Sequence, residues 1–222
     1  MNFLEICQRS QNEAGIEGEA ISTVVGQTGR LLRLTEWVNT AYIDIIGIHD
    51  SWLFLRSEFS FPTVSGTQNY SYSDAAITDF GRWDKDTFRI YSSLSDEVDL
   101  EYCLWQDFRA VYKKGAFRST SGRPNTFSIL PDQTIDLYPI PNAIFTVNGE
   151  YVSQPTEMST DSDEPVFPSQ FHMAIVWRTV MLIAGYSAGN FEYVNAQNEF
   201  RQILNKMEKN QLPQITWGAP LC

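Results

Sequence analysis

Cysteine and histidine are scarce in this sequence of 222 residues, which holds three cysteines and two histidines. Cys7, Cys103 and Cys222 are odd in number and show no CxxC spacing. The sequence therefore predicts neither a disulfide framework nor a zinc site. Reduced thiols are expected, as in a protein synthesised in the cytosol.

Basic residues are also few. Sixteen lysines and arginines stand against 27 aspartates and glutamates, which gives a net charge of −11. Such a charge opposes non-specific binding to phosphates. The composition thus argues against a basic nucleic-acid-binding domain.

Long apolar runs are missing as well. The most apolar segment, FHMAIVWRTVMLIAGY at residues 171–186, is shorter than the ~20 residues that span a bilayer, and it holds His172 and Arg178. The first residues, MNFLEICQRSQNEAG, do not have the pattern of a signal peptide. No membrane partner is expected, and the apolar helix should be enclosed by other protein.

Motifs for catalysis occur only in the wrong context. GYSAG, residues 185–189, matches the GxSxG pattern of hydrolases, which needs a strand before the serine and a histidine after it. Here a helix is predicted before Ser187 and no histidine follows, so a helix–helix turn is favoured over a nucleophile. His49 and His172 have no partner at a telling spacing and are interpreted as structural histidines.

The acidic segment around Asp161, Asp163 and Glu164 resembles the start of a calcium loop. The glycine and the closing glutamate of an EF-hand are missing, so a solvated acidic turn is predicted. A P-loop and a GxGxxG motif are also absent from the sequence. We therefore predict a protein that is not an enzyme and has no catalytic residues, no cofactor and no metal.

One segment, residues 108–123, concentrates the few cations. Phe108, Tyr112 and Phe117 alternate with them, so the segment could stack and pair with single-stranded nucleic acid. The net charge instead favours the exposed face of a short helix and its loop, which could meet an acidic partner or a neighbouring copy. The cations are Arg109, Lys113, Lys114, Arg118 and Arg123.

Helical periodicity marks both ends of the chain. A short helix is predicted from Phe3 to Ala14, before Gly15, and a second one opens at Thr28 or Gly29. A further helix begins at Pro168-Ser169, is broken by GYSAG, and is followed by a last helix at residues 191–211. The inward residues are Leu31, Leu34, Val38, Ala41, Ile45 and Ile48 in the second helix, and Val194, Phe200, Ile203, Leu204 and Met207 in the last.

Alternating apolar residues mark the middle of the chain as strands. The clearest is Glu97–Leu104, and the pairs Phe59/Phe61, Tyr70/Tyr72 and Phe88/Ile90 repeat the pattern. Residues 127–138 predict a hairpin with a three-residue loop, and residues 143–152 a strand with a bulge at Asn148-Gly149. A helix from residue 105 to Gly115 should bury Trp105, Phe108, Val111 and Tyr112.

This order of elements predicts an α+β fold, because the terminal helices need one another to cover their apolar stripes. The N-terminal helices of the bundle should span residues 1–56 and the C-terminal helices residues 166–211. Between them, residues 57–165 form a β-rich insertion, and residues 212–222 form an extended C-terminal arm, since Pro213 and Pro220 prevent a helix.

Five segments together resemble the head-to-tail adaptor (connector, or head completion) proteins of tailed bacteriophages. They are VVGQTGRLLRLTEWVNTAYIDI (24–45), SWLFLR (51–56), GEYV (149–152), DSDEPVFPSQFHMAIVWRTVMLIAGY (161–186) and QLPQITWGAPLC (211–222). The resemblance implies a structural protein of the virion neck, assembled in the host cytoplasm, that catalyses no reaction. It also implies a homo-oligomeric ring, twelvefold like the portal, which extends the DNA channel without binding DNA specifically and which attaches the tail.

The resemblance also implies partners and interface residues. The portal protein and tail proteins, whether nozzle, tail tube or fibre, are the expected partners. The arm is predicted to bind the portal; the alternative is that it folds back over its own bundle. The portal-binding residues would be Leu212, Pro213, Trp217, Pro220 and Leu221, and the bundle core or subunit interface would use Phe171, Ile175, Val176, Trp177, Val180 and Ile183.

A rival interpretation is a tail-associated structural protein that recognises a carbohydrate receptor. Tyr70, Tyr72, Trp83 and Tyr91 could supply stacking surfaces for sugar rings, although packing in a core accounts equally well for aromatic residues in strands.

Overall fold

The computed structural model describes residues 1–187 and 190–213, and the chain divides into two compact units. The helical unit comprises Met1–Leu55 together with the described residues from Pro155 onward. The β unit comprises Arg56–Gln154. Helices thus flank a β-rich middle, and the predicted α+β class is confirmed.

The first helix, α1 (Phe3–Glu13), is fixed at both ends by local sequence. Asn2 and Glu5 form a capping box, in which each side chain accepts a hydrogen bond from the backbone N–H of the other, at 2.9 and 3.0 Å. Beyond the C-cap Ala14, Gly15 adopts a φ of 61°, which is easily reached without a β-carbon. The predicted end of this helix is confirmed.

The second helix, α2 (Gly29–Ile46), buries the predicted stripe at Leu34, Val38, Ala41 and Ile45. The prediction for Ile48 is wrong. The helix ends at the C-cap Gly47, so Ile48 leaves the helical period and is 39% exposed.

The C-terminal helices are α4 (Met173–Ser187) and α5 (Asn190–Gln211), and a 3₁₀ turn, Ser169–Phe171, precedes α4. The break predicted at GYSAG starts too early, because Gly185 and Tyr186 still belong to α4. In α5 the prediction of an inward Val194 is wrong: Val194 is 55% exposed, and Ala196 is buried instead.

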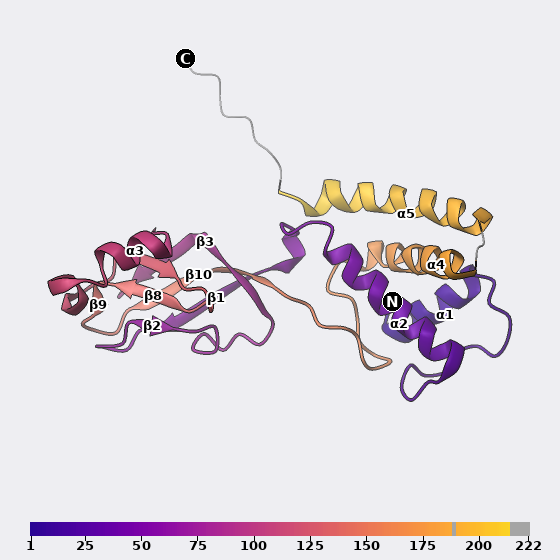
Figure 1. Ribbon diagram of the computed structural model, residues 1–222, viewed down its shortest axis with the longest axis horizontal. Coiled ribbons are helices and arrows are strands. Elements are labelled where there is room, and N and C mark those ends of the chain that lie inside the picture. Colours follow the sequence, from indigo (N-terminus) through magenta and orange to yellow (C-terminus); the bar gives the residue numbers. More distant parts are fainter. Residues whose placement is uncertain (188–189, 214–222) are drawn as a thin grey trace, which may run out of the picture. The chain divides into compact units, whose positions relative to one another are not determined.

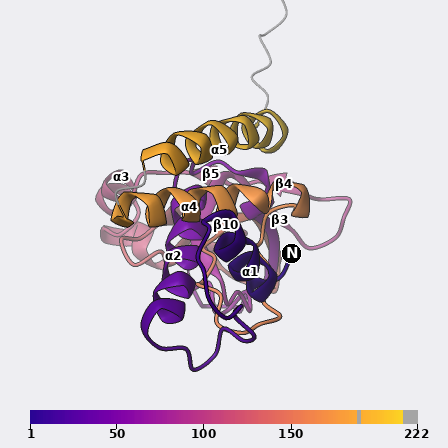
Figure 2. The same ribbon diagram turned by 90° about the vertical axis from the view of Figure 1, so that its right-hand side faces the viewer.

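Within the helical unit, α4 lies between α5 on one side and α1 and α2 on the other (Figures 1 and 2). This central position explains why α4 is apolar around most of its circumference. The enclosure by other protein that its sequence predicts is therefore supplied by the chain's own helices.

The β unit contains two four-stranded sheets and one pair of short strands (Figure 1). The first sheet has the order β1 (Arg56–Pro62), β10 (Thr146–Ser153), β3 (Phe80–Tyr91), β4 (Val98–Asp99). The second has the order β2 (Asn69–Tyr70), β8 (Ile135–Tyr138), β7 (Thr126–Ile129), β5 (Glu101–Tyr102). The pair is β6 (Ser121–Gly122) with β9 (Ile140–Pro141). The β unit also contains the short helical elements α3 (Trp105–Val111) and η2 (Gly115–Ser119), whereas η1 (Leu53–Leu55) is the last element of the helical unit before β1.

One aromatic core joins the two larger sheets. Phe88 of β3 stacks on Phe127 of β7 with ring centres 4.3 Å apart, and Phe59 of β1 meets Trp83 edge-on at 4.7 Å. Such pairs stabilise a core beyond the area that they bury. The predicted inward pairs Phe59/Phe61 and Phe88/Ile90 are buried here, whereas Tyr72 lies outside β2 and is 42% exposed.

The predicted hairpin of β7 and β8 is confirmed, including its three-residue loop. Leu130 N donates to Thr134 O at 2.9 Å and Gln133 N donates to Leu130 O at the same distance, so Pro131–Gln133 form the loop. Gln133 has a φ of 67°, as expected for the last residue of such a loop.

The predicted strand Glu97–Leu104 is wrong. The segment forms two strands in different sheets: β4 pairs with β3, and β5 pairs with β7. Leu100, between them, is buried, whereas Val98 and Leu104 are 47% and 61% exposed. A chain that crosses from one sheet to the other at Leu100 cannot keep one face inward along its whole length.

The bulge predicted at Asn148-Gly149 exists, but the extra residues belong to the partner strand. Asn148 pairs with Arg89 and Glu150 with Asp84, so residues 85–88 of β3 lie opposite Gly149. The hydroxyl of Thr87 accepts the hydrogen bond of Glu150 N at 2.8 Å and thereby satisfies a backbone donor at the irregularity.

Helix α3 buries less than its sequence predicts. Only Phe108 is fully buried; Trp105 and Tyr112 are half-buried, and Val111 is 50% exposed. Tyr112 stacks on Tyr138 of β8 at 4.1 Å. The prediction for Val111 is therefore wrong, because so short a helix touches the sheet along a narrow line only.

Candidate functional site

The two histidines serve as structural contacts, as predicted. His49 Nε2 lies 2.9 Å from Glu208 Oε1, and its ring meets Trp52 edge-on. His172 is buried between the amino group of Met1, at 2.9 Å, and the carbonyl oxygen of Phe167, at 3.0 Å. Burial lowers the pKa of His172, which keeps the ring neutral. In the part of the chain that the structure describes, no cluster of three or more potential ligands could hold a metal ion.

The acidic segment forms a turn at Asp161–Ser162 with Glu164 exposed, as predicted, and its two aspartates also form hydrogen bonds within the unit. Asp161 Oδ1 accepts hydrogen bonds from Val24 N at 2.6 Å and from the Thr23 hydroxyl at 3.2 Å. Asp163 Oδ2 accepts from Ser159 N and Thr160 N. A hydrogen bond from the Thr160 hydroxyl, which has the largest effect, and the two from these N–H groups lower the pKa of Asp163 to about 2. The carboxylates thus hold this loop in shape.

The five cations of residues 108–123 do not share one exposed face, so that prediction is wrong for two of them. Lys113 Nζ lies 2.6 Å from Oδ2 of the buried Asp136. Arg123 pairs with Asp96 at 3.2 Å and donates to Ile90 O at 3.0 Å. The exposed cations are Arg109, Lys114 and Arg118.

Two of the four aromatic residues considered for carbohydrate binding are buried in the β core. Trp83 is buried and its Nε1 donates to Gln133 O at 2.7 Å. Tyr70 is buried, and its hydroxyl bonds to the backbone of Val64 and Thr67. Tyr72 is exposed, but its ring already stacks on Phe80 at 5.0 Å. Trp83 and Tyr70 are therefore unavailable to a sugar ring, one face of Tyr72 is already occupied, and Tyr91 at the end of β3 is half-buried.

The residues assigned to a bundle core or subunit interface lie in and just before α4. Trp177 is half-buried and packs beside Val180, Met181 and Ala196. Those buried within the single chain are Phe171, Ile175, Val176, Val180 and Ile183.

The residues assigned to portal binding follow α5. Leu212 N donates to Glu208 O at 3.1 Å, and Pro213 is exposed. Trp217, Pro220 and Leu221 lie outside the described residues.

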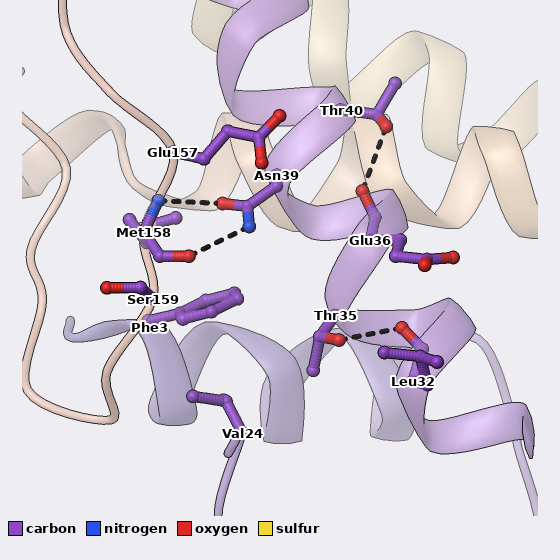
Figure 3. Close-up of a pocket in the computed structure, with 10 residues that line it drawn as sticks. All are labelled: Phe3, Val24, Leu32, Thr35, Glu36, Asn39, Thr40, Glu157, Met158 and Ser159. Atoms are coloured by element: carbon purple, nitrogen blue, oxygen red, sulfur yellow. Dashed lines mark hydrogen bonds between the residues drawn. The ribbon is translucent and has the colours of Figure 1, made fainter. Parts of the chain in front are cut away.

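A pocket of about 300 Å³ opens beside α2 (Figure 3). Asn39 fixes its wall through two hydrogen bonds to the backbone of Met158: Nδ2 donates to O at 2.9 Å, and Oδ1 accepts from N at 3.1 Å. Glu36 and Glu157 are exposed carboxylates on the lining. The remaining lining residues are Phe3, Val24, Leu32, Thr35, Thr40 and Ser159.

A cation–aromatic cluster lies beside the pocket, where Arg33 and Trp37 of α2 meet Tyr186 of α4. Arg33 of α2 places its guanidinium carbon 4.8 Å from the ring centre of Tyr186 and 5.9 Å from that of Trp37. The two rings are 5.6 Å apart, and Tyr186 is 69% exposed. Neither the pocket nor this cluster was predicted from the sequence, although the i, i+4 spacing of Arg33 and Trp37 indicates that the two side chains are neighbours.

Comparison with known families places these features in context. A sequence model of the SU10 adaptor protein family matches residues 1–221. The chain belongs to this family. SU10 adaptor proteins are head-to-tail adaptors of bacteriophages and structural proteins of the virion, so the resemblance stated from the sequence is confirmed. No curated protein sequence matches the chain significantly.

Membership of the SU10 adaptor family has consequences for partners and location. A head-to-tail adaptor contacts portal and tail proteins and lies in the neck of the virion. The family is structural rather than enzymatic. Among the helices of the described residues, none has the length and apolar character to cross a membrane.

Proposed function

We propose that the protein assembles as a ring, twelvefold like the portal, beneath the portal vertex. The ring extends the DNA channel and provides the attachment site of the tail. The observation that carries this proposal is the family match, which spans residues 1–221 and so includes both units and the C-terminal segment.

The portal contact is assigned to the C-terminal arm. Leu212, Pro213, Trp217, Pro220 and Leu221 give it large apolar anchors beside two prolines that prevent a helix. An extended arm of this length reaches roughly 35 Å at about 3.3 Å per residue. The helix α5 ends at Gln211, directly before the arm, which supports a departure from the bundle at this point.

The wall of the DNA channel is proposed to repel the DNA that passes through it. With a net charge of −11, a ring of copies presents many more carboxylates than cations. Carboxylates repel phosphates, so the duplex passes without a point of adhesion.

Native mass spectrometry of the purified protein mixed with portal rings of the same virus tests the ring beneath the portal and the portal contact of the arm. Binding of the full chain to the portal should saturate at the number of copies that completes one ring. A chain truncated after Gln211 and the variant Trp217→Ala should bind much more weakly. Leu94→Ala is the matched control, since it removes an apolar side chain that is 83% exposed on the β unit.

Two outcomes would contradict the proposal at different points. If the truncated chain binds as well as the full chain, the arm does not dock on the portal and folds over its own bundle instead. If the full chain does not bind, the ring beneath the portal is refuted, and titration with glycans then tests the carbohydrate-binding alternative.

A further inference from the structure

The exposed side of α2 carries two features of opposite charge. One is the pocket with Glu36 and Glu157; the other is the cluster of Arg33, Trp37 and Tyr186. Successive residues of a helix are turned by about 100°, so Arg33 and Trp37 face a different direction from Leu32 and Glu36. A single copy therefore shows an acidic pocket on one side of α2 and a cationic aromatic cluster on another.

The pocket lacks a cation. None of its lining residues is basic, and both carboxylates are exposed. Leu32, which is 41% exposed and lies one helical turn from Glu36, adds apolar surface beside that carboxylate, so the chemistry fits a side chain with an apolar stem and a cationic end. The paired hydrogen bonds of Asn39 with Met158 hold the pocket open in advance, which reduces the entropy lost on binding.

The cluster lacks a carboxylate. Arg33 has no ion-pair partner among the described residues, whereas Arg9 and Arg178 of the same unit pair with Glu13 and Asp44. Its guanidinium lies against two aromatic rings, and Tyr186 exposes 69% of its surface. An exposed arginine on an aromatic platform is typical of the anchors that dominate protein interfaces.

A ring needs two different surfaces on each copy. In a closed heterologous assembly, one surface of each subunit meets another surface of the next. Copies with a net charge of −11 also repel one another, so specific contacts between cations and carboxylates are needed to bring them together. The two features of α2 satisfy both requirements.

We propose that the acidic pocket of one copy receives the Arg33–Trp37–Tyr186 cluster of the next copy, so that α2 forms the contact between neighbouring subunits. The proposal rests on the proposed ring and names the residues that join its subunits. The occupant is a second copy of this chain, because the chain itself carries the cation and the aromatic surface that the pocket lacks.

Charge reversal tests this pairing on full-length protein bound to portal rings. Glu36→Arg and Arg33→Glu, each alone, place like charges together and should weaken cooperative binding of copies about tenfold or more. An equimolar mixture of the two variants should bind nearly as well as the wild type. In a ring in which the variants alternate, each reversed pocket meets a reversed cluster and each unchanged pocket meets an unchanged cluster. Glu192→Arg and Arg201→Glu are matched controls, since both reverse an exposed charge on α5.

Native mass spectrometry counts the copies on each portal and shows whether the mixture alternates. Far-UV circular dichroism and the Tm of each variant establish that it is folded. Loss of cooperativity in each single variant and its recovery in the mixture would support the proposal. The α2 contact is refuted if Glu36→Arg and Arg33→Glu both bind as the wild type does, or if Arg201→Glu disrupts the ring and the two α2 variants do not. The connector function stands in either case.

A failure of the proposed function itself gives a different result. If wild-type protein does not bind the portal, self-association of the same variants is measured at low ionic strength by sedimentation velocity. If each single charge reversal disrupts self-association and the mixture restores it, the contact between subunits is supported although the proposed portal binding is not. Absence of wild-type self-association would overturn it.

Discussion

At the scale of single residues, the pair of Lys113 and Asp136 ties the segment after α3 to the second sheet. The carboxylate of Asp136 is buried, and burial raises its pKa, while the ammonium group of Lys113 at 2.6 Å opposes that rise. A buried charge that loses its partner destabilises a fold strongly. Lys113 keeps 24% of its side chain exposed, so water moderates the effect.

Lys113→Met should therefore lower the free energy of unfolding of the β unit by about 2 kcal/mol at pH 7. Without the ammonium group, the folded state favours the protonated carboxyl still more, so the deficit should shrink as pH falls from 7 towards 4. Urea unfolding followed by near-UV circular dichroism measures both effects. Lys114→Met is the matched control because Lys114 is exposed, and an equal loss in that variant would contradict the role of the ion pair.

In the helical unit, the pKa of Asp163 is shifted in the opposite direction from that of Asp136. The pKa of Asp163 falls from 3.8 to about 2 through hydrogen bonds from Thr160 and Ser159. Because the folded state favours the ionised form, the stabilisation is complete above about pH 4 and is lost as pH falls towards 2.

Asp163→Asn should consequently lower Tm at pH 6 and have little effect at pH 2. Thermal unfolding followed at 222 nm at both pH values measures the difference. Glu164→Gln is the neighbouring control, since Glu164 is exposed. A Tm loss of Asp163→Asn that is the same at both pH values would show that the carboxylate charge is not what matters.

The sequence predicted residue roles well where one local pattern decides them. The lack of motif partners around His49 and His172 sufficed to predict structural histidines. Lys113 and Arg123 were wrongly predicted to be exposed on the basis of the net charge, and their partners Asp136 and Asp96 lie 23 and 27 residues away in the sequence. Pairs of this kind form only when strands and loops distant in sequence meet, and no local spacing reveals them.

At the scale of elements, strand β10 depends on a glycine at the irregularity of β3. A β-carbon at Gly149 would lie 3.0 and 3.1 Å from two ring carbons of Phe59 and 3.3 Å from the Thr87 hydroxyl. Both neighbours are held, Phe59 by the aromatic core and Thr87 by its hydrogen bonds to Asp84 and Glu150. The site therefore has no room for a methyl group.

Gly149→Ala should destabilise the β unit by about 1–3 kcal/mol through overpacking. Gly185→Ala in α4 should instead stabilise the helical unit by about 0.5–1 kcal/mol, because its β-carbon would meet no heavy atom within 4 Å and alanine favours a helix. Chemical unfolding of both variants against the wild type checks the two signs. The same sign for both would contradict this account of their surroundings.

Element prediction from the sequence failed where tertiary structure interrupts a period. The alternation of Glu97–Leu104 is real, but the chain changes sheet at Leu100, and periodicity carries no information about pairing. The glycine at 149 correctly marked an irregularity, yet the extra residues lie in β3, whose sequence shows no sign of them. The hairpin of β7 and β8 was predictable because its turn residues determine it locally.

At the scale of the whole molecule, the α+β class and the order of helices and strands followed from the change of hydrophobic period along the chain. The structure adds that the β unit begins and ends at adjacent positions. Arg56, its first residue, pairs with Val152 of β10, two residues before its last residue, Gln154. A unit whose ends meet can be inserted into a loop of another unit with little strain.

Residues 56–154 expressed alone should therefore fold. All members of the aromatic core that joins both larger sheets lie inside this unit, so the fragment keeps the whole of that core. The fragment should show a near-UV circular dichroism signal and a single cooperative unfolding transition in urea. A shorter fragment, residues 56–145, is the control: it lacks β10, which lies between β1 and β3 in the first sheet, and it should remain unfolded. If the longer fragment also lacks near-UV signal and cooperativity, the β unit depends on the helical unit for its fold, and the insertion is structurally inseparable from the bundle.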